Sequence, residues 1–357
     1  MKYQNKNSSE LKKKIKEAKL DALLITNFRN IKHLTGFSSL EGVLLITGKE
    51  SVFFTGICEL AEAKSKITSF KINERKRGDW NFLNDFIKRA KIKRLGFEEE
   101  YFSVAGLRSL RRISLNCKLK GTSGIVEQLR AIKTLQEIAK IKKAVSITEK
   151  IFTGVKKNLR PGLTELDIAG NLSERIAKCG RKPAFNPIVA FGAHTASPHA
   201  QPGRKSLKKG DLVLIDMGVD FEGYKSDMTR TFSLGRPNSK QVQIYNVIME
   251  AKDFIQRVIK PGILIAEVEE KAHRFFSGRG WGKFFPHSVG HGIGLDVHER
   301  PFFSTKSKDT LVPGMVFTLE PAVYFPGWGG VRIEDLYLVN RRSCQKLSQL
   351  SLYPLQG

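Results

Sequence analysis

Two pairs of carboxylates in the C-terminal half of the chain are the residues best suited to chemistry. Asp216 and Asp227 flank one turn-rich segment. Glu320 and Glu334 flank a second one, with Gly327 midway between them. If each segment reverses the chain, in the first case near residues 221–222, the members of a pair lie opposite each other with Cβ atoms roughly 5 Å apart. Carboxylates this close repel, so the sequence predicts a shared proton or a bound cation.

Histidines add nitrogen ligands and acid–base groups to the same region. Six of the seven histidines lie between His194 and His298, and three fall within residues 287–298. Glycines on both sides of His291 let the backbone turn sharply or approach a ligand. Four carboxylates and one imidazole favour manganese, and less strongly cobalt or iron, over a cysteine-type zinc site. Two such ions would activate a bridging hydroxide and polarise a substrate carbonyl.

An internal repeat indicates which elements position these residues. Residues 147–162 resemble residues 248–262, and each stretch predicts a helix and a Pro-Gly break before a further amphipathic helix. The apolar strands predicted at 210–216 and 314–320 also correspond, and each ends in a carboxylate. A single acidic hairpin is usually solvated. Two repeat-related copies instead favour two half-domains that share one site.

The first third of the chain predicts a separate, smaller domain. Helix and strand patterns alternate there, and two apolar runs at 42–47 and 51–55 predict a hairpin. The fold class expected is therefore mixed α/β (α+β), with an N-terminal α/β domain at residues 1–122 and a catalytic domain at residues 123–357. One long helix over residues 123–159 is expected to follow the first domain.

Composition indicates a globular protein. The chain is 41% hydrophobic and 9% aromatic, which argues against disorder. No run of about 18 apolar residues and no apolar N-terminal stretch occurs, so neither a membrane protein nor a secretory signal is expected. The four cysteines are scattered without metal-ligand spacing, which favours free thiols in a reducing cytoplasm.

The net charge of +26 raises the hypothesis of a nucleic-acid or acidic-surface partner. Residues 1–122 carry 26 Lys and Arg against 13 Asp and Glu, which is half of the excess in a third of the chain. These basic residues follow helix-like stretches such as 11–19 and 88–94 without interleaved aromatic residues. That pattern is typical of a solvated face, so nucleic acid is not expected as a functional partner.

The motifs around these residues resemble the pita-bread metallopeptidases, in particular Xaa-Pro aminopeptidase (aminopeptidase P) and Xaa-Pro dipeptidase (prolidase). The resemblance extends into the N-terminal domain through Asn30–Phe37 and into the linker helix through Val126–Lys133. It implies a small N-terminal domain and a C-terminal pita-bread domain with a pseudo-two-fold repeat. The supporting stretches are Asp216–Gly218, Gly223–Phe232, Gly290–Gly294, Val297–Pro301, Thr318–Pro321 and Val331–Asp335.

The resemblance implies a site for two divalent ions, with manganese favoured and cobalt, iron or zinc as alternatives. Asp227 and Glu334 would bridge the two ions. The complete ligand set argues against creatinase-like and chaperone-like relatives, which keep the fold but lose ligands. The implied ligands are Asp216, Asp227, His291, Glu320 and Glu334, all present in the chain.

Catalytic roles follow from the same resemblance. Glu320 would shuttle the proton of the nucleophilic water, while His287 and His298 would stabilise the oxyanion and orient the substrate. His199 matches a histidine that shapes the substrate cleft. Arg332 would hold either a carboxylate ligand or the substrate through its guanidinium fork.

The activity implied is metal-dependent hydrolysis, by a metal-bridged hydroxide, of the bond between an N-terminal residue and proline. Aminopeptidase P is favoured, with Xaa-Pro dipeptidase as the alternative. Methionine aminopeptidase is less favoured, because it usually lacks a separate N-terminal domain. Outside the enzymes, a basic nucleic-acid-binding pseudo-enzyme is the alternative, and the intact ligand set argues against it. The substrates would be peptides with proline at the second position, and the family implies a cytoplasmic homodimer.

The chain departs from the family pattern at two places outside the ligand set. Thr55–Cys58 stands where an Asp-x-Arg-Tyr-like stretch is usual, and His33 stands where tyrosine is common. These departures leave open how the N-terminal domain shapes the cleft.

Overall fold

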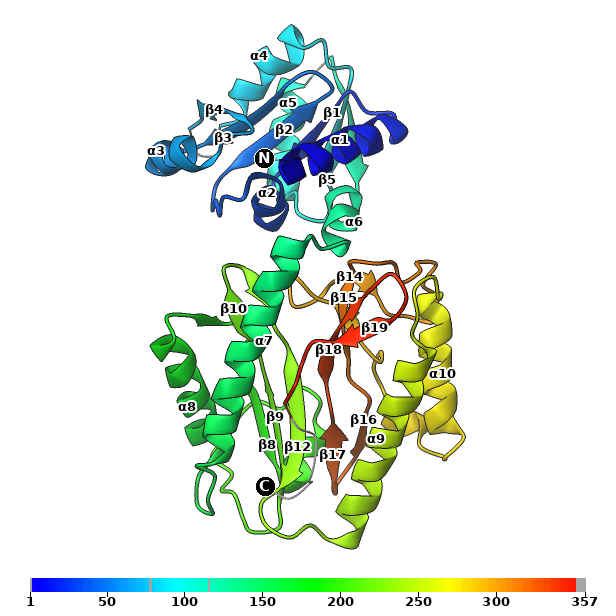
Figure 1. Ribbon diagram of the computed structural model, residues 1–357. Helices are drawn as coiled ribbons and strands as arrows, with labels where there is room; N and C mark the ends of the chain where they lie inside the picture. The colour runs from blue at the N-terminus through cyan, green and yellow to red at the C-terminus, as the bar shows by residue number, and fades with distance from the viewer. Residues whose placement is uncertain (1, 77–78, 115, 351–357) are drawn as a thin grey trace. The chain divides into compact units, whose positions relative to one another are not determined.

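The computed structural model describes residues 2–76, 79–114 and 116–350. The chain forms two compact units, residues 1–130 and residues 131–357. Figure 1 shows that both units combine helices with strands, which confirms the mixed α/β class. Within the described residues, no helix has the length and apolarity needed to cross a membrane.

A six-stranded sheet forms the centre of the first unit, in the order β4-β3-β2-β1-β5-β6. The predicted hairpin is confirmed as the antiparallel pair β2 and β3. Because neighbouring strand residues point to opposite faces, β1 contributes Leu23 to one core and Leu24 to the other. The elements are α1 (Lys2–Glu17), β1 (Ala22–Ile25), α2 (Phe28–Thr35), β2 (Val43–Thr47), β3 (Ser51–Thr55), α3 (Ile57–Lys66), β4 (Lys71–Glu74), α4 (Asn81–Arg89), β5 (Arg94–Glu98), α5 (Val104–Ile113), β6 (Lys118–Thr122) and α6 (Ile125–Ala131).

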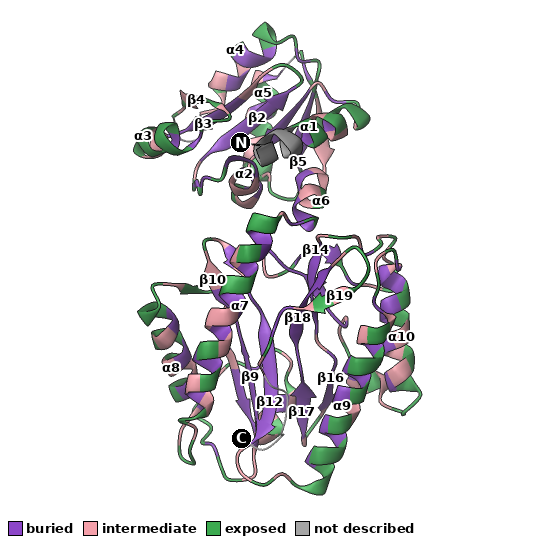
Figure 2. Ribbon diagram, viewed as in Figure 1, coloured by how far each residue is buried: buried purple, intermediate pink, exposed green. Residues whose placement is uncertain are grey.

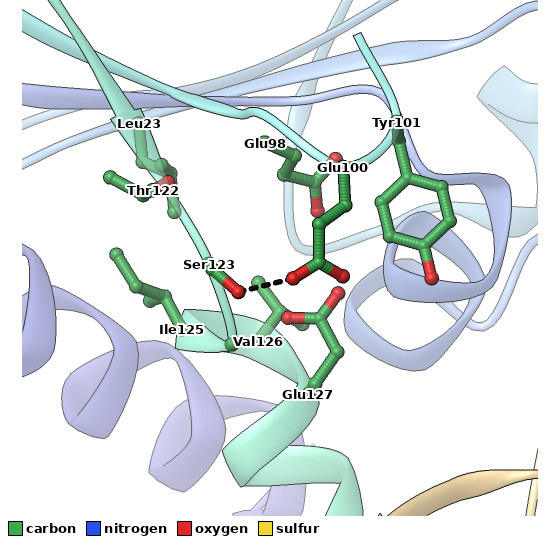
Figure 3. A pocket seen from close by; sticks show the side chains of 10 residues that line it. Leu23, Glu98, Glu100, Tyr101, Thr122, Ser123, Ile125, Val126 and Glu127 are labelled. Atoms are coloured by element: carbon green, nitrogen blue, oxygen red, sulfur yellow. Dashed lines mark hydrogen bonds between the residues drawn. The ribbon is translucent and has the colours of Figure 1, made fainter.

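A buried carboxylate at the end of β5 fastens the start of α2. Glu98 accepts hydrogen bonds from the backbone N–H groups of Thr26 and Asn27, both at 2.7 Å, and from the Asn30 amide at 2.6 Å. Burial raises the pKa of Glu98. Figure 3 shows Glu98, Glu100 and Glu127 around a cavity of about 10 Å³. This volume suits a water molecule and is far too small for a peptide.

The second unit contains four long helices, α7 to α10, and antiparallel strands that lie between α7 and α8 on one side and α9 and α10 on the other (Figure 1). Figure 2 shows that the strands are mostly buried, while the helices expose one face. The elements are α7 (Leu135–Lys156), α8 (Glu165–Lys178), β7 (Lys182–Pro183), β8 (Ile188–Phe191), β9 (Leu212–Met217), β10 (Val219–Phe221), β11 (Tyr224–Lys225), β12 (Met228–Ser233), α9 (Ser239–Val258), α10 (Ile265–Ser277), β13 (His291–Gly292), β14 (Glu299–Phe302), β15 (Val316–Leu319), β16 (Ala322–Phe325), β17 (Gly329–Arg332), β18 (Asp335–Val339) and β19 (Cys344–Lys346), with 3₁₀ turns at Gly192–Ala196 and Gly282–Phe284.

The internal repeat is confirmed by matching details of the two helix pairs. Gly162 and Gly262 both have positive φ, +92° and +85°, at the break between the two helices. Each donates its backbone N–H to a carbonyl of a following loop, that of Leu207 in one half and that of Leu311 in the other. The two halves therefore share one chain path, and each brings its own strands to the centre of the unit.

The prediction of one helix over residues 123–159 is wrong, because the chain forms α6 and α7 with a break at residues 132–134. The Thr134 side chain accepts from the N–H of Glu137, and the Glu137 carboxylate accepts from the N–H of Thr134, so a capping box starts α7. Ile132 forms a β-bridge with Met315, and the backbone N–H of Lys133 donates to Gly314. Contacts with a segment about 180 residues away therefore end α6, and a helix pattern does not reveal them.

Replacing Thr134 by Ala removes this cap and is expected to destabilise the second unit by about 1 kcal/mol. The measurement is urea unfolding followed by circular dichroism on the metal-free protein. Thr153→Ala is the matched control, because Thr153 is exposed in the last turn of the same helix, far from the cap, and Ala is the better helix former. Equal destabilisation by the two substitutions would contradict the capping assignment.

Candidate metal centre

The first acidic pair lies on the hairpin of β9 and β12, but its register differs from the prediction. Asp216 pairs with Thr229, and continuation of the same register places Asp227 opposite Gly218 rather than opposite Asp216. The chain reverses at Glu222 and Gly223, which have φ angles of +54° and +94°, as in a two-residue type I′ turn. The turn lies one residue later than predicted, so the register shifts by two and Asp216 and Asp227 are diagonal neighbours on one face.

The second acidic pair follows the prediction. Leu319 pairs with Asp335 in the ladder of β15 and β18, and Ala322 pairs with Arg332 in the ladder of β16 and β17. Both ladders have the same register, which places Glu320 directly opposite Glu334. Gly327, with φ +78°, lies in the turn that this symmetry requires.

The carboxylates of the two hairpins meet around His291 on β13. Its Nε2 atom lies 3.7 Å from Asp227 Oδ2, 3.6 Å from Glu320 Oε1 and 3.9 Å from Glu334 Oε1. Asp227, His291 and Glu334 are buried, and their ligand atoms lie within 4.8 Å of one another. His291 Nδ1 is 3.2 Å from the Gly292 carbonyl, which can only accept, so Nδ1 carries the proton and the Nε2 lone pair faces the carboxylates.

Burial and mutual repulsion shift the protonation of the cluster. Burial, followed by the charges of Glu334, Asp216 and Glu320, raises the pKa of Asp227. Burial, followed by the charges of Glu320 and Asp216, raises the pKa of Glu334, and burial raises that of Glu320 to about 8. Burial lowers the pKa of His291 to about 3, so the imidazole is neutral and able to ligate.

These residues fit the divalent cations that the resemblance implies. Within the described residues, Asp216 Oδ1 and Asp227 Oδ1 are buried and have no hydrogen-bond partner. Four ionised carboxylates and Arg332 carry a formal charge of −4 + 1 = −3, so a cation of high charge is needed to keep them deprotonated in a buried place. Oxygen-rich ligands with one imidazole suit hard or borderline divalent ions.

Arg332 orients one carboxylate and links it to a tyrosine. Its Nη2 donates to Asp216 Oδ2 at 2.7 Å, and its Nη1 donates to the Tyr324 hydroxyl at 2.6 Å. His287 Nδ1 donates to the Ser288 carbonyl at 2.7 Å, which leaves Nε2 as the acceptor of a 3.0 Å hydrogen bond from Tyr324. Burial lowers the pKa of His287 to about 4, which keeps it in this neutral form. Sequence reasoning missed Tyr324, whose only signal is a hydroxyl within an apolar strand.

Further polar residues of β12 and β18 join the two hairpins, and sequence reasoning missed them as well. Thr229 Oγ1 donates to Glu334 Oε2 at 2.7 Å and fixes the orientation of that carboxylate. Arg230 Nη2 lies 2.6 Å from Asp335 Oδ1, and its Nη1 donates to the Glu334 carbonyl. Lys252 also pairs with Asp335, and these three charged side chains are buried. A network of buried charged side chains therefore adjoins the acidic cluster at Glu334.

The cluster opens into a cavity of about 500 Å³, a volume in the range of small-ligand sites. All nine residues predicted for the site line it, and no member of that set lies elsewhere. Within the described part of the chain, the ring nitrogens of His298 have no hydrogen-bond partner. The ring centroids of His298 and His291 lie 4.1 Å apart. Apolar side chains line the cavity as well, namely Phe185, Ile188, Pro198 and Val297.

Family models assign both units. Residues 139–341 match the metallopeptidase family M24 model, and residues 8–132 match the creatinase/prolidase N-terminal domain. The chain belongs to metallopeptidase family M24. The resemblance drawn from the motifs is thereby confirmed, as are the pita-bread fold of the second unit and a hydrolase activity of the metallopeptidase type.

Relatives of this M24 peptidase include proteins named as Xaa-Pro peptidases. The chain is 34% identical to an Xaa-Pro dipeptidase of Pyrococcus horikoshii over 92% of its own length and 93% of the relative. The structure is similar to that of an Xaa-Pro dipeptidase from Bacillus anthracis, with a TM-score of 0.95, 32% identity and 99% of each chain covered. It is also similar to an X-Pro aminopeptidase from Thermotoga maritima, with a TM-score of 0.87, 32% identity and coverage of 95% and 98%.

The raised carboxylate pKa values predict how the stability of the metal-free protein depends on pH. The folded pKa of Glu320, about 8, exceeds the value of 4.5 for an ordinary Glu, so its proton stabilises the fold fully below pH 4.5. That stabilisation is lost as the pH rises through 8. We expect the Tm of chelator-treated protein to fall between pH 5 and pH 8. Manganese should raise Tm more strongly at pH 8, because it competes with fewer protons.

Differential scanning fluorimetry at four pH values, with and without manganese, checks this expectation. Glu320→Gln is the control variant and should flatten the pH dependence of the metal-free protein. Curves with and without metal that run parallel across this pH range would count against the assignment.

Proposed function

We propose that this M24 peptidase is an Xaa-Pro aminopeptidase that uses two divalent ions, with manganese as the preferred metal. One observation carries the proposal: a largely buried cluster of four carboxylates and one imidazole opens into a cavity of about 500 Å³ whose lining includes apolar side chains. The five proposed ligands are Asp216, Asp227, His291, Glu320 and Glu334. Bound ions would supply an activated water and polarise the scissile carbonyl.

The side chains around the ligands have distinct proposed tasks. Glu320, which is 16% exposed and lines the cavity, takes the proton of the attacking water and passes it to the departing nitrogen. His298 is neutral, because burial lowers its pKa, and donates an N–H to the oxyanion. His287 has no free N–H in the tautomer that its hydrogen-bond partners require, so it orients the site through Tyr324 and Arg332.

The apolar wall supports selectivity for proline. An Xaa–Pro bond is a tertiary amide without an N–H, so a site that depends on that donor binds it poorly. Phe185, Ile188 and Val297 offer a surface on which a pyrrolidine ring is buried favourably. His199, also in the lining, would contact the substrate as well.

The charges of the cavity favour longer peptides over dipeptides. Among the described residues that line it, Arg332 is the one lysine or arginine, and it already donates to Asp216, Tyr324, Thr229 and the Pro198 carbonyl. A dipeptide would place its terminal carboxylate in this cavity without an unused cation to balance it. A peptide that continues beyond proline has a neutral amide there. The second candidate, Xaa-Pro dipeptidase, is favoured by the names of the relatives.

Purified protein with manganese is expected to hydrolyse Ala-Pro-Ala with a kcat/KM at least about tenfold above that for Ala-Pro, because only the dipeptide buries a free carboxylate. Amidation of Ala-Pro should restore its hydrolysis, and Ala-Ala-Ala is the control for proline selectivity. Preference for Ala-Pro would make the protein a dipeptidase. Cleavage of Met-Ala peptides alone would indicate methionine aminopeptidase. Absence of all hydrolysis, with tight nucleic-acid binding at physiological salt, would indicate a pseudo-enzyme.

Asp227→Asn and Glu334→Gln are each expected to abolish activity and to lower the bound metal, because each residue is proposed to bridge both ions. Elemental analysis after dialysis against manganese checks the metal content per chain. Asp220→Asn is the matched control: Asp220 lies on the same hairpin, pairs with Lys225, and should retain metal and turnover. Full metal occupancy in either bridging variant would contradict the assignment.

A further inference from the structure

A short loop connects the two histidines of the site. His291 on β13 and His298, just before β14, are separated by residues 292–297. Because the ring nitrogens of His298 have no hydrogen-bond partner within the described residues, the position of the ring depends on the backbone of this loop and on the contact with the His291 ring. The loop is irregular, with a register shift between His291 and Gly292, so sheet pairing alone does not fix it.

The carboxylate of Glu299 fills the inside of this loop. Its Oε2 atom accepts the backbone N–H groups of Leu295 at 3.1 Å and Asp296 at 3.2 Å. Its Oε1 atom lies 2.9 Å from Lys133 Nζ. The Glu299 side chain therefore accepts from two backbone N–H groups that have no partner within the loop, and its second oxygen pairs with the Lys133 ammonium.

Lys133 is held firmly in the break between α6 and α7. Its side chain is 1% exposed and that of Glu299 is 5% exposed, so the ion pair is shielded from water. The Lys133 ammonium also donates to the Ala131 carbonyl, and its backbone N–H donates to Gly314. The position of the Lys133 ammonium is thus set by contacts with the backbone of the second unit.

The close approach leaves no room for a side chain at Gly294. A Cβ atom there would lie 2.3 Å from Glu299 Oε1 and 3.0 Å from Lys133 Cε. The Gly294 carbonyl accepts from the backbone of Lys225, and its N–H donates to the Asp296 carbonyl. The loop therefore encloses the ion pair tightly, and movement of either partner displaces the backbone next to His298.

We propose that the buried pair of Lys133 and Glu299 positions His298 for turnover. Both are positioning residues, since they act through the loop and lie outside the cavity lining. The inference rests on the proposed function, in which His298 contacts the substrate. A purely stabilising pair would lower Tm when broken and leave kcat unchanged, which separates the two roles experimentally.

The test compares Lys133→Met, Glu299→Gln and the double variant, with His298→Ala as the reference for a lost imidazole. Lys133→Met should lower kcat for Ala-Pro-Ala at least about tenfold, because misplacing a catalytic group by about 1 Å costs up to a hundredfold. KM should change less than about threefold, and manganese content should stay at the wild-type level. The double variant should recover part of kcat, because the neutral amide accepts the loop N–H groups without needing the ammonium.

Hydrogen–deuterium exchange of the metal-free proteins gives a readout that is independent of activity. Lys133→Met and Glu299→Gln should accelerate exchange in peptides covering residues 292–299, while the α9 peptides stay unchanged. Leu172→Ala is the matched control, because Leu172 is a fully buried residue of α8 and its truncation should lower Tm without affecting the loop.

Normal kcat and normal loop exchange in both single variants would overturn the proposal, even if Tm falls as it does in Leu172→Ala. If Lys133→Met does not fold, the isosteric Glu299→Gln decides by the same criteria. If wild-type protein cleaves no Xaa-Pro peptide, the proposed function fails, and the exchange data still decide whether the pair orders the loop.

Discussion

Four carboxylates, three of them buried and that of Glu320 partly buried, cannot remain ionised side by side without a strong compensating charge, and the second unit is organised around this constraint. Burial and repulsion raise the pKa values of Asp227, Glu320 and Glu334 in the protein without metal. The single guanidinium of Arg332 balances one of the four charges. Divalent cations would balance the rest, and for this reason folding, proton binding and metal binding are linked here. The neutral His291, whose Nε2 lone pair faces the carboxylates, completes a binding site that is better suited to a metal cation than to bound protons.

Hydrogen bonds between the two half-domains hold this acidic cluster in place. Arg332 of the second half donates to Asp216 of the first. Thr229 and Arg230 of the first half donate to the carboxylate of Glu334 and to its backbone carbonyl in the second. Each half thus orients the acidic residues of the other, and neither hairpin alone would present its carboxylates correctly. A repeat with one acidic hairpin in each copy becomes a site only when the copies face one another.

The repeat and the motifs that carry the family resemblance were sufficient to predict the fold, the half-domains and nine of the residues that line the cavity, because these depend on local patterns. The failures have nonlocal or backbone causes. The turn at Glu222 and Gly223 requires a positive φ at a glutamate, which the residue type does not indicate. The break between α6 and α7 is imposed by Met315 and Gly314, far along the chain. Tyr324 acquires its importance from contacts with His287 and Arg332 that only the folded hairpins create.

In the proposed mechanism, metal retention and turnover depend on different parts of this architecture. His291 faces three carboxylates and would be fixed by the ion that they share, whereas His298 has no such partner among the described residues. A loop positions its ring, and backbone N–H groups of that loop donate to the carboxylate of Glu299. Glu299 is in turn held by its ion pair with Lys133. We expect a change in that loop to leave the proposed cation ligands in place and still move the imidazole that is proposed to contact the substrate. The precision required for catalysis therefore extends to a buried ion pair beyond the ligands, where neither residue touches metal or peptide.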